Sequence, residues 1–165
     1  FTLNFFYIIG CGKHIIHRQE RVGRFGKVFT IVKFRSMVVG AEDTSGPVKA
    51  TGADPRVVRG MGWVRKSRLD EFPQFWNILR GEMSIVGPRP ERPEFAAQYE
   101  IIIPGYGRRH DIPPGLTGLA QVHGHYHTDP GFKLGHDLQY LVNWSPILDL
   151  QIILRTVWTV VTGRL

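Results

Sequence analysis

Two short apolar runs joined by a glycine-containing turn constrain the fold of this chain most. The first run, IIHRQERV, ends at Val22, and the second, VFTIVKF, begins at Val28. The linking residues GRFGK include two glycines, which tolerate the backbone angles of a tight reversal. Runs rich in Val, Ile, Phe and Thr on either side of such a turn are typical of a β-hairpin. We therefore expect one antiparallel hairpin, against which the other elements pack.

The rest of the chain carries mainly helical patterns. The segments MSIVGPRPERP and IPPGLTGLAQVHG predict short strands, rigid turns and loops. A length of 165 residues suits one domain with its own core. The chain is therefore expected to be a small α+β domain. Its expected helices cover residues 57–66, 71–79, 94–103, 131–143 and 146–161.

The stretch SRLDEFPQFWN places two adjacent carboxylates, Asp70 and Glu71, between basic and aromatic residues. One interpretation is structural, because Asp is a preferred N-cap and Pro73 is tolerated in a first helical turn. The apolar residues of this stretch recur at helical spacing, so they are expected to face the core: Leu69, Phe72, Trp76 and Leu79.

The same two carboxylates can also perform chemistry. A helix start presents unpaired N–H groups and a positive dipole end, which attract phosphate, and the cations of Arg65, Lys66 and Arg68 lie just upstream. An Asp carboxylate can attack phosphorus and form an acyl phosphate. Mg²⁺ takes one or two carboxylates together with phosphate oxygens, and it would screen the repulsion between two anions. The residues alone leave the structural and the chemical interpretation open.

The charge and hydropathy of the chain narrow its partners. A net charge of +7 favours nucleic acid, an acidic membrane surface or a phosphorylated substrate. In the segment SPILDLQIILRTVWTVV, Ser145 is the expected N-cap and Pro146 the first helical residue. A helix this apolar lies either in a core, which is the more frequent case, or flat on a membrane. The opening FTLNFFYII is too short to span a bilayer, which takes roughly 20 residues.

Two rival functions follow from other patterns. In HGHYH, His123, His125 and His127 occupy alternate positions, so on a strand they would project from one face and could hold zinc. The basic hairpin also contains phenylalanines, which together with cations could form a surface for stacking nucleic-acid bases. No cysteine pair or second His cluster at zinc spacing supports the first, since Cys11 is the single cysteine.

Four ordered motifs together resemble a known family. They are RQERVGRFGKVFTIVKFRSM, RKSRLDEFPQFWNILRGEMSIVGPRP, PPGLTGLAQVHG and DLQYLVNWSPILDLQIILRTV, and they span nearly all of residues 17–161. The chain resembles the bacterial sugar transferases, the monotopic phosphoglycosyl transferases that act on polyprenyl phosphate. The resemblance implies transfer of a sugar phosphate from a nucleotide sugar, usually a UDP-sugar, to undecaprenyl phosphate, at the start of exopolysaccharide, O-antigen or capsule synthesis. It also implies a covalent phosphosugar intermediate and a need for Mg²⁺.

The resemblance assigns roles to individual residues. Asp70 matches the family nucleophile, and Glu71 matches its partner, which with Asp70 would hold the metal. The positions that match substrate phosphate-binding or supporting residues of the family are Lys33, Arg65, Arg89, His125 and Asp137. Family members usually carry Arg where this chain has His125, and a His is a poorer phosphate clamp near neutral pH, so weaker substrate binding is expected.

The resemblance also implies an arrangement at the membrane. Residues 1–16 are expected to be the remnant of an N-terminal membrane-inserted segment, and residues 17–165 the catalytic domain. That domain would place amphipathic helices along the cytoplasmic face of the bacterial inner membrane. The expected partners are a UDP-sugar, polyprenyl phosphate and membrane lipids rather than nucleic acid, and an oligomer is compatible with the sequence.

Overall fold

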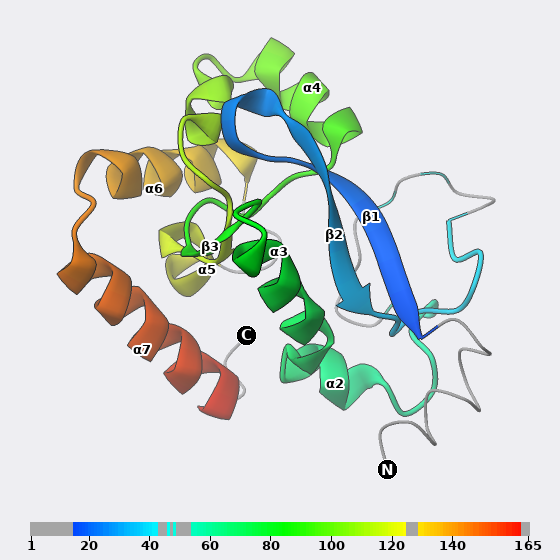
Figure 1. Ribbon diagram of the computed structural model, residues 1–165. Coiled ribbons are helices and arrows are strands. Elements are labelled where there is room, and N and C mark those ends of the chain that lie inside the picture. Colours follow the sequence, from blue (N-terminus) through cyan, green and yellow to red (C-terminus); the bar gives the residue numbers. More distant parts are fainter. Residues whose placement is uncertain (1–14, 43–45, 47, 49–53, 125–128, 163–165) are drawn as a thin grey trace.

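A computed structural model of the chain describes residues 15–42, 46, 48, 54–124 and 129–162 (Figure 1). Helices and short strands are mixed along this part of the chain, as expected for an α+β domain. The elements in chain order are β1 (Ile16–Val22), η1 (Arg24–Gly26), β2 (Val28–Phe34), α2 (Gly62–Lys66), η2 (Leu69–Gln74), α3 (Phe75–Leu79), β3 (Ser84–Val86), α4 (Pro93–Ile102), η3 (Tyr106–His110), β4 (Gly115–Thr117), α5 (Leu119–His123), α6 (Pro130–Val142) and α7 (Pro146–Thr162), where η marks a 3₁₀ helix.

The expected hairpin is confirmed. Strands β1 and β2 pair antiparallel along their whole length, from Val22 opposite Val28 to Ile16 opposite Phe34. The turn includes Gly26 with a φ of 74°, a conformation that glycine adopts without steric cost. The hairpin forms a long arm across one side of the molecule, with α4 at its turn and α2 near its open end (Figure 1).

A second, very short sheet pairs β3 with β4 in parallel. The backbones approach so closely here that a Cβ atom on Gly115 would clash with the backbone of Gly87. The same holds for a Cβ atom on Gly118, which precedes α5. These glycines therefore let the PGLTG segment pack directly on the GPRP turn, and this packing brings α5 and α7 close to η2.

The hydrophobic core is divided into three small clusters. One lies between the hairpin's open end and α2 around Met61, and one lies under α4 and α6 around Tyr106. The third joins Val86 of β3 to Ile152 of α7 and Tyr140 of α6. Because each cluster is small, buried polar contacts carry much of the connection between elements.

Two segments differ from the elements that were expected for them. The helix expected from residue 57 begins at Gly62, because Val57 instead forms an antiparallel bridge with Met37 and Gly60 has a positive φ of 86°. In the IPPGLTGLAQVHG segment the expected strand is confirmed as β4, but residues 119–123 form a helix that the sequence did not predict. The helices expected at 94–103, 131–143 and 146–161 correspond to α4, α6 and α7.

The SRLDEFPQFWN stretch folds with the opposite orientation to the one predicted. Its apolar side chains are exposed rather than buried: Leu69 is 41%, Phe72 61%, Trp76 59% and Leu79 80% exposed. The buried residues at helical spacing are polar, namely Asp70, Glu71, Gln74 and Asn77. The expectation of an apolar core-facing stripe is therefore wrong, and the helix turns its polar face inward.

Hydrogen bonds to the hairpin explain this inversion. Asn77 is 1% exposed, its amide donates to the Thr30 carbonyl at 2.8 Å, and its side-chain oxygen accepts from the Val32 N–H at 3.2 Å. These contacts satisfy polar groups that burial would otherwise leave unpaired. Asp70 is not an N-cap, because the N-cap of η2 is Arg68, which has a left-handed φ of 55°.

Helix α7 also exposes most of its apolar surface. Ser145 caps it as expected, accepting from the Leu148 N–H at 3.1 Å. Only Ile152 is buried, whereas Ile147, Leu154 and Trp158 are each more than 60% exposed. The core location expected for this segment therefore holds for one face, where Leu148, Ile152 and Ile153 join the third core cluster, and not for the exposed apolar face. Across the described residues no helix combines the length and the apolarity that crossing a bilayer demands.

Candidate active site

Glu71 is a buried carboxylate held by two arginines. Arg89 Nη2 lies 2.5 Å from Glu71 Oε1 and Arg89 Nη1 lies 3.5 Å from Oε2, while Arg68 Nη1 lies 3.4 Å from Oε2. Burial raises the pKa of Glu71, but the charges of Arg89 and Arg68 outweigh it and bring that pKa to about 2. At neutral pH Glu71 is therefore an anion fixed in orientation by a two-pronged contact.

Asp70 differs from Glu71 because no arginine holds its carboxylate. It is 9% exposed, and its carboxylate has no hydrogen-bond or ion-pair partner among the described residues. Burial, together with the charge of Glu71, raises the pKa of Asp70 to about 6, against the opposing charges of Lys33 and Arg65. A desolvated carboxylate without a hydrogen-bond partner is a better nucleophile than a solvated one.

Three of the sequence-predicted cations lie near Asp70. Burial lowers the pKa of Lys33 to about 8, with Arg21 lowering it further and Glu71 raising it, so Lys33 is not the surface residue that a lysine on a strand usually is. Arg65 reaches back from α2, with its Nη1 3.4 Å from the Ser36 hydroxyl. The cations of Lys33, Arg65 and Arg89 all act on the pKa of Asp70, so the structure gathers them around one carboxylate.

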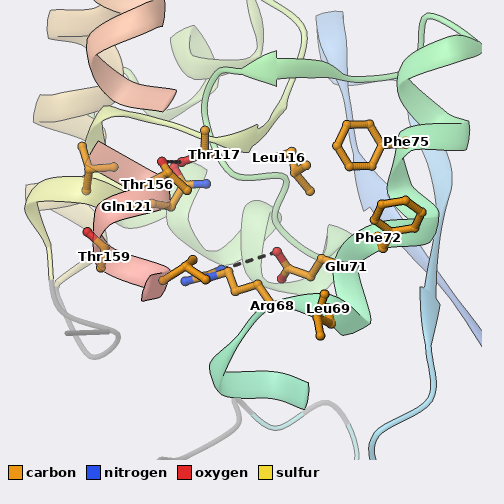
Figure 2. Close-up of a pocket in the computed structure, with 12 residues that line it drawn as sticks. Arg68, Leu69, Glu71, Phe72, Phe75, Leu116, Thr117, Gln121, Thr156 and Thr159 are labelled. Carbon is orange, nitrogen blue, oxygen red and sulfur yellow. Dashed lines mark hydrogen bonds and ion pairs between the residues drawn. The ribbon is translucent and has the colours of Figure 1, made fainter. Parts of the chain in front are cut away.

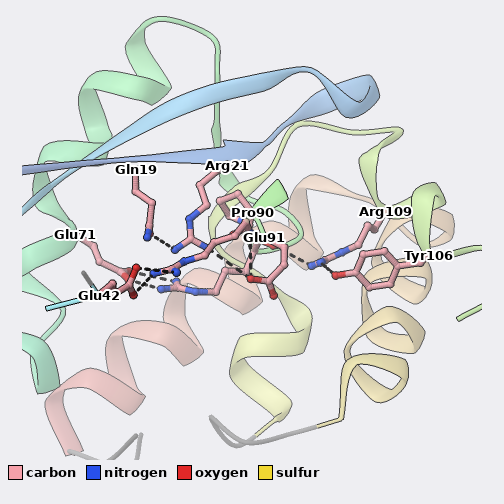
Figure 3. Close-up of polar contacts among 10 residues, drawn as sticks. Gln19, Arg21, Glu42, Glu71, Pro90, Glu91, Tyr106 and Arg109 are labelled. Carbon is pink, nitrogen blue, oxygen red and sulfur yellow. Dashed lines mark hydrogen bonds and ion pairs between the residues drawn. The ribbon is translucent and has the colours of Figure 1, made fainter. Parts of the chain in front are cut away.

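Asp137 supports the site through a buried arginine. It is 1% exposed and forms an ion pair with Arg109, whose Nη2 lies 2.8 Å and Nε 2.9 Å from Asp137 Oδ2. Arg109 also donates to the Arg89 carbonyl at 2.9 Å and to the Tyr106 hydroxyl at 2.6 Å (Figure 3). Asp137 therefore acts on the GPRP turn through Arg109.

Two further residues, which the sequence did not indicate as functional, support the GPRP turn. Arg109 carried no motif signal, since it lies in the unremarkable run GYGRRHD. Arg21 lies in the quoted RQERV motif, and its Nη1 donates to the Pro90 carbonyl at 3.1 Å (Figure 3). The consecutive carbonyls of Arg89 and Pro90 thus accept from two different arginines, Arg109 on η3 and Arg21 on the hairpin. This double contact fixes the turn from which Arg89 reaches Glu71.

The first residue of the histidine cluster lies on a helix and not on the strand that the zinc alternative would require. His123 ends α5, with its Nε2 3.0 Å from Arg155 Nη1 and its ring stacked on His136 at 5.3 Å between centroids. His125 and His127 lie outside the described residues. Within the described ranges no three His, Cys, Asp or Glu side chains gather as a metal site would need.

The dyad has the donor chemistry for a magnesium ion that is shared with substrate. Mg²⁺ is usually held by one or two carboxylates plus substrate phosphates, rather than by an all-protein cage. Asp70 offers unengaged oxygens, whereas those of Glu71 already contact arginines. The carboxylates of the pair therefore have the chemistry to hold Mg²⁺ together with phosphate oxygens of a substrate.

A cavity of about 150 Å³ lies beside the dyad, between η2, β4, α5 and α7 (Figure 2). Glu71 and Arg68 line its η2 side. Across from them are Thr156 and Thr159 of α7, and Gln121 of α5. The site thus consists of a buried dyad, a ring of cations and an adjoining cavity.

The raised pKa of Asp70 has a measurable consequence in the metal-free protein. As pH falls through about 6, Asp70 should take up a proton while Glu71 stays ionised. Because the ammonium of Lys33 lowers the pKa of Asp70, Lys33→Met should raise it. Carbon-13 NMR of Asp carboxyls in EDTA measures both midpoints. A midpoint for Asp70 near 4, or one that does not rise in Lys33→Met, would contradict the assigned surroundings.

Comparisons with known proteins agree on one family. The profile described as Bacterial sugar transferase matches residues 2–163. The chain is 43% identical over 152 residues to the UDP-N-acetylgalactosamine-undecaprenyl-phosphate N-acetylgalactosaminephosphotransferase of Aeromonas hydrophila, covering 90% of this chain and 36% of that protein. It is 43% identical over 149 residues to the UDP-glucose:undecaprenyl-phosphate glucose-1-phosphate transferase of Escherichia coli (strain K12), covering 87% of this chain and 32% of that one.

A shorter relative is covered along most of its length. The chain is 38% identical over 151 residues to the exopolysaccharide production protein PSS of Rhizobium leguminosarum bv. phaseoli, covering 87% of this chain and 76% of that protein. By contrast, the chain spans about a third of the length of the two transferases named first. The matched profile extends over nearly the whole sequence, so this chain belongs to the bacterial sugar transferase family.

Proposed function

We propose that this chain catalyses transfer of a sugar 1-phosphate from a UDP-sugar to undecaprenyl phosphate, with release of UMP. The observation that carries the proposal is the Asp70–Glu71 dyad. Arg89 holds the carboxylate of Glu71, whereas the buried carboxylate of Asp70 has no hydrogen-bond partner among the described residues. The relatives named above include a glucose-1-phosphate and an N-acetylgalactosamine-phosphate transferase acting on undecaprenyl phosphate. In this role the chain would begin the synthesis of an exopolysaccharide, O-antigen or capsule.

The reaction proceeds in two displacements at phosphorus. First, an Asp70 carboxylate oxygen bonds to the β-phosphorus of the UDP-sugar, and the bond from that phosphorus to the bridging oxygen breaks, so the electron pair leaves with UMP. Second, a phosphate oxygen of the acceptor bonds to the same phosphorus, and the bond to Asp70 breaks. The carboxylate is regenerated, and the product is a polyprenyl diphosphate sugar.

The surrounding charged residues have different roles in this reaction. Lys33 and Arg65 supply positive charge beside Asp70, where the phosphate oxygens would lie. Arg89 is 44% exposed at its side chain, so it can contact a phosphate while it holds Glu71. Asp70 and Glu71 would hold Mg²⁺, which when bound screens the repulsion between the carboxylate and the diphosphate. His125 and Asp137 remain a proposed phosphate contact and a positioning residue, respectively.

The outward apolar faces support attachment to a membrane surface. The exposed side chains of η2, α3 and α7 include Phe72, Trp76, Leu154 and Trp158, an arrangement that is costly in water and favourable at a lipid interface. The net charge of +7 adds attraction to anionic lipids. We place this face on the cytoplasmic side of the bacterial inner membrane, where undecaprenyl phosphate is embedded.

A charge-insertion variant tests the membrane face. Leu154→Glu combined with Trp158→Glu should weaken binding to vesicles containing anionic lipid by about tenfold or more, because two charged groups would enter the interface. Ile101→Glu, at an 85% exposed residue of α4, is the matched control and should bind as the unmodified chain does. Equal vesicle co-sedimentation of the double variant and the unmodified chain would refute this orientation.

Release of UMP provides the direct test of function. The full chain in detergent, with Mg²⁺ and undecaprenyl phosphate, should release UMP from at least one member of a UDP-sugar panel and form a lipid-linked diphosphate sugar. UMP release without a lipid product would indicate hydrolysis instead. Neither product, from a folded protein and the whole panel, would refute the proposed reaction.

A further inference from the structure

The cavity beside the dyad has walls that suit hydrocarbon. Most of its lining is apolar, formed by Leu69, Phe72, Phe75, Leu116, Val122 and Val160. The hydroxyl of Thr159 is already used, since it donates to the Arg155 carbonyl at 2.8 Å. A buried hexose would leave several hydroxyls without partners on such walls, and each unpaired group costs free energy. The lining therefore disfavours the sugar of the donor as the occupant.

One part of the wall is polar and incompletely paired. Gln121 lines the cavity, and both polar atoms of its side chain are buried without a hydrogen-bond partner among the described residues. Arg68 extends from η2 toward Thr159 of α7, and its guanidinium contacts Glu71 through one nitrogen (Figure 2). A guanidinium has five N–H donors, so most of them remain available to an anion. The cavity thus combines hydrocarbon walls with amide and guanidinium donors.

The cavity is also continuous with the outward apolar faces. Leu69, Phe72 and Phe75 line it and are nevertheless 41%, 61% and 42% exposed. Val160 lines it from α7, next to Val161, which is 77% exposed. A hydrocarbon chain can therefore pass from the exposed apolar surface into the cavity without crossing a polar surface.

From this combination we propose that the cavity binds the phosphate-proximal isoprene units of the polyprenyl phosphate acceptor, whose phosphate contacts Arg68 and the amide of Gln121. This inference rests on the proposed function and names the acceptor's place in it. An anionic head joined to a hydrocarbon body matches both the donors and the walls. Because Arg68 also contacts Glu71, the acceptor phosphate is brought next to the dyad that carries the phosphosugar.

Half-reactions separate the acceptor's site from the donor's. Formation of the phosphosugar intermediate releases UMP in a burst without any acceptor, whereas its decay requires the acceptor. Val160→Phe narrows the cavity and should raise the KM for polyprenyl phosphate about tenfold, the effect of losing burial of about two methylene groups. The burst of UMP should be unchanged. Val142→Phe, at a 78% exposed residue of α6, is the matched control and should alter neither half-reaction.

A second variant tests the polar wall without filling the cavity. Gln121→Glu places a negative charge opposite the acceptor phosphate and should raise the same KM more than Gln121→Met does. The ratio of each variant's acceptor KM to that of the unmodified chain should be the same for short acceptors, such as farnesyl phosphate, as for long ones. The reason is that only the first isoprene units occupy the cavity.

The possible results discriminate between occupants. A normal UMP burst with slowed transfer to both short and long acceptors supports the proposal. A reduced burst in Val160→Phe or Gln121→Glu, with the acceptor KM unchanged, would assign the cavity to the donor and overturn it. So would normal kinetics in both variants. Absence of a burst in the unmodified chain would instead refute the proposed covalent mechanism, which keeps the two failures distinguishable.

Discussion

Asp70→Asn is expected to lower the rate of UMP release by roughly 10⁴-fold or more, because an amide cannot form the bond to phosphorus that begins the reaction. The change is nearly isosteric, so the fold should survive. Removing a charge that burial disfavours should even leave stability equal or higher, since the pKa of Asp70 is raised in the folded chain. The measurement is a steady-state UMP assay on protein purified from a host that lacks related enzymes.

Asp111→Asn provides the control for this loss of activity. Asp111 is a half-exposed carboxylate paired with Arg108 at 3.5 Å, remote from the dyad in its contacts. Its replacement should change the rate less than twofold. Persistence of UMP release in Asp70→Asn at a tenth of the normal rate or more would contradict the assignment of Asp70 as the nucleophile.

Asp137→Leu is expected to have the largest effect on stability, lowering the free energy of unfolding by about 3–5 kcal/mol. The physical reason is that Arg109 would remain buried and charged without its counterion, at a position where its side chain is only 6% exposed. Replacing both partners, with Arg109→Met added, removes the uncompensated charge and should recover part of the loss. Urea unfolding of the detergent-solubilised protein, followed by tryptophan fluorescence, measures both changes.

The exposed pair Arg108–Asp111 again serves as the control for the buried one. Asp111→Asn should alter the free energy of unfolding by less than about 0.5 kcal/mol. A loss of less than about 1 kcal/mol in Asp137→Leu would show that the Arg109 network does not hold the structure. Because Arg109 donates to the Arg89 carbonyl, the double variant should stay less active than the unmodified chain even where stability recovers.

The elements that the sequence predicted correctly are those governed by local rules. The hairpin follows from β-rich runs around a glycine turn, and α7 follows from Ser145 as N-cap and Pro146 at its first position. The orientation of η2 and α3 could not be predicted in this way. Periodicity locates an apolar face but does not say whether protein or lipid covers it, and here Asn77 ties the polar face to the hairpin.

The candidate site could likewise be predicted from the sequence only in part. Asp70 and Glu71 were identified through the family motif, and their different surroundings became visible only when Arg89 and Arg68 were placed around Glu71. Arg109 could not have been found from its sequence neighbourhood. Its role depends on contacts with residues 20 and 28 positions away along the chain, which no local pattern records.

The proposed reaction depends most on a covalent bond between phosphorus and Asp70. The direct measurement is mass spectrometry of the full chain, quenched after mixing with a UDP-sugar and Mg²⁺ in the absence of acceptor. We expect a mass increase of one sugar phosphate, located by fragmentation on the peptide that contains Asp70 and lost when undecaprenyl phosphate is added. An unmodified Asp70 in a preparation that still forms the lipid-linked product would contradict the mechanism.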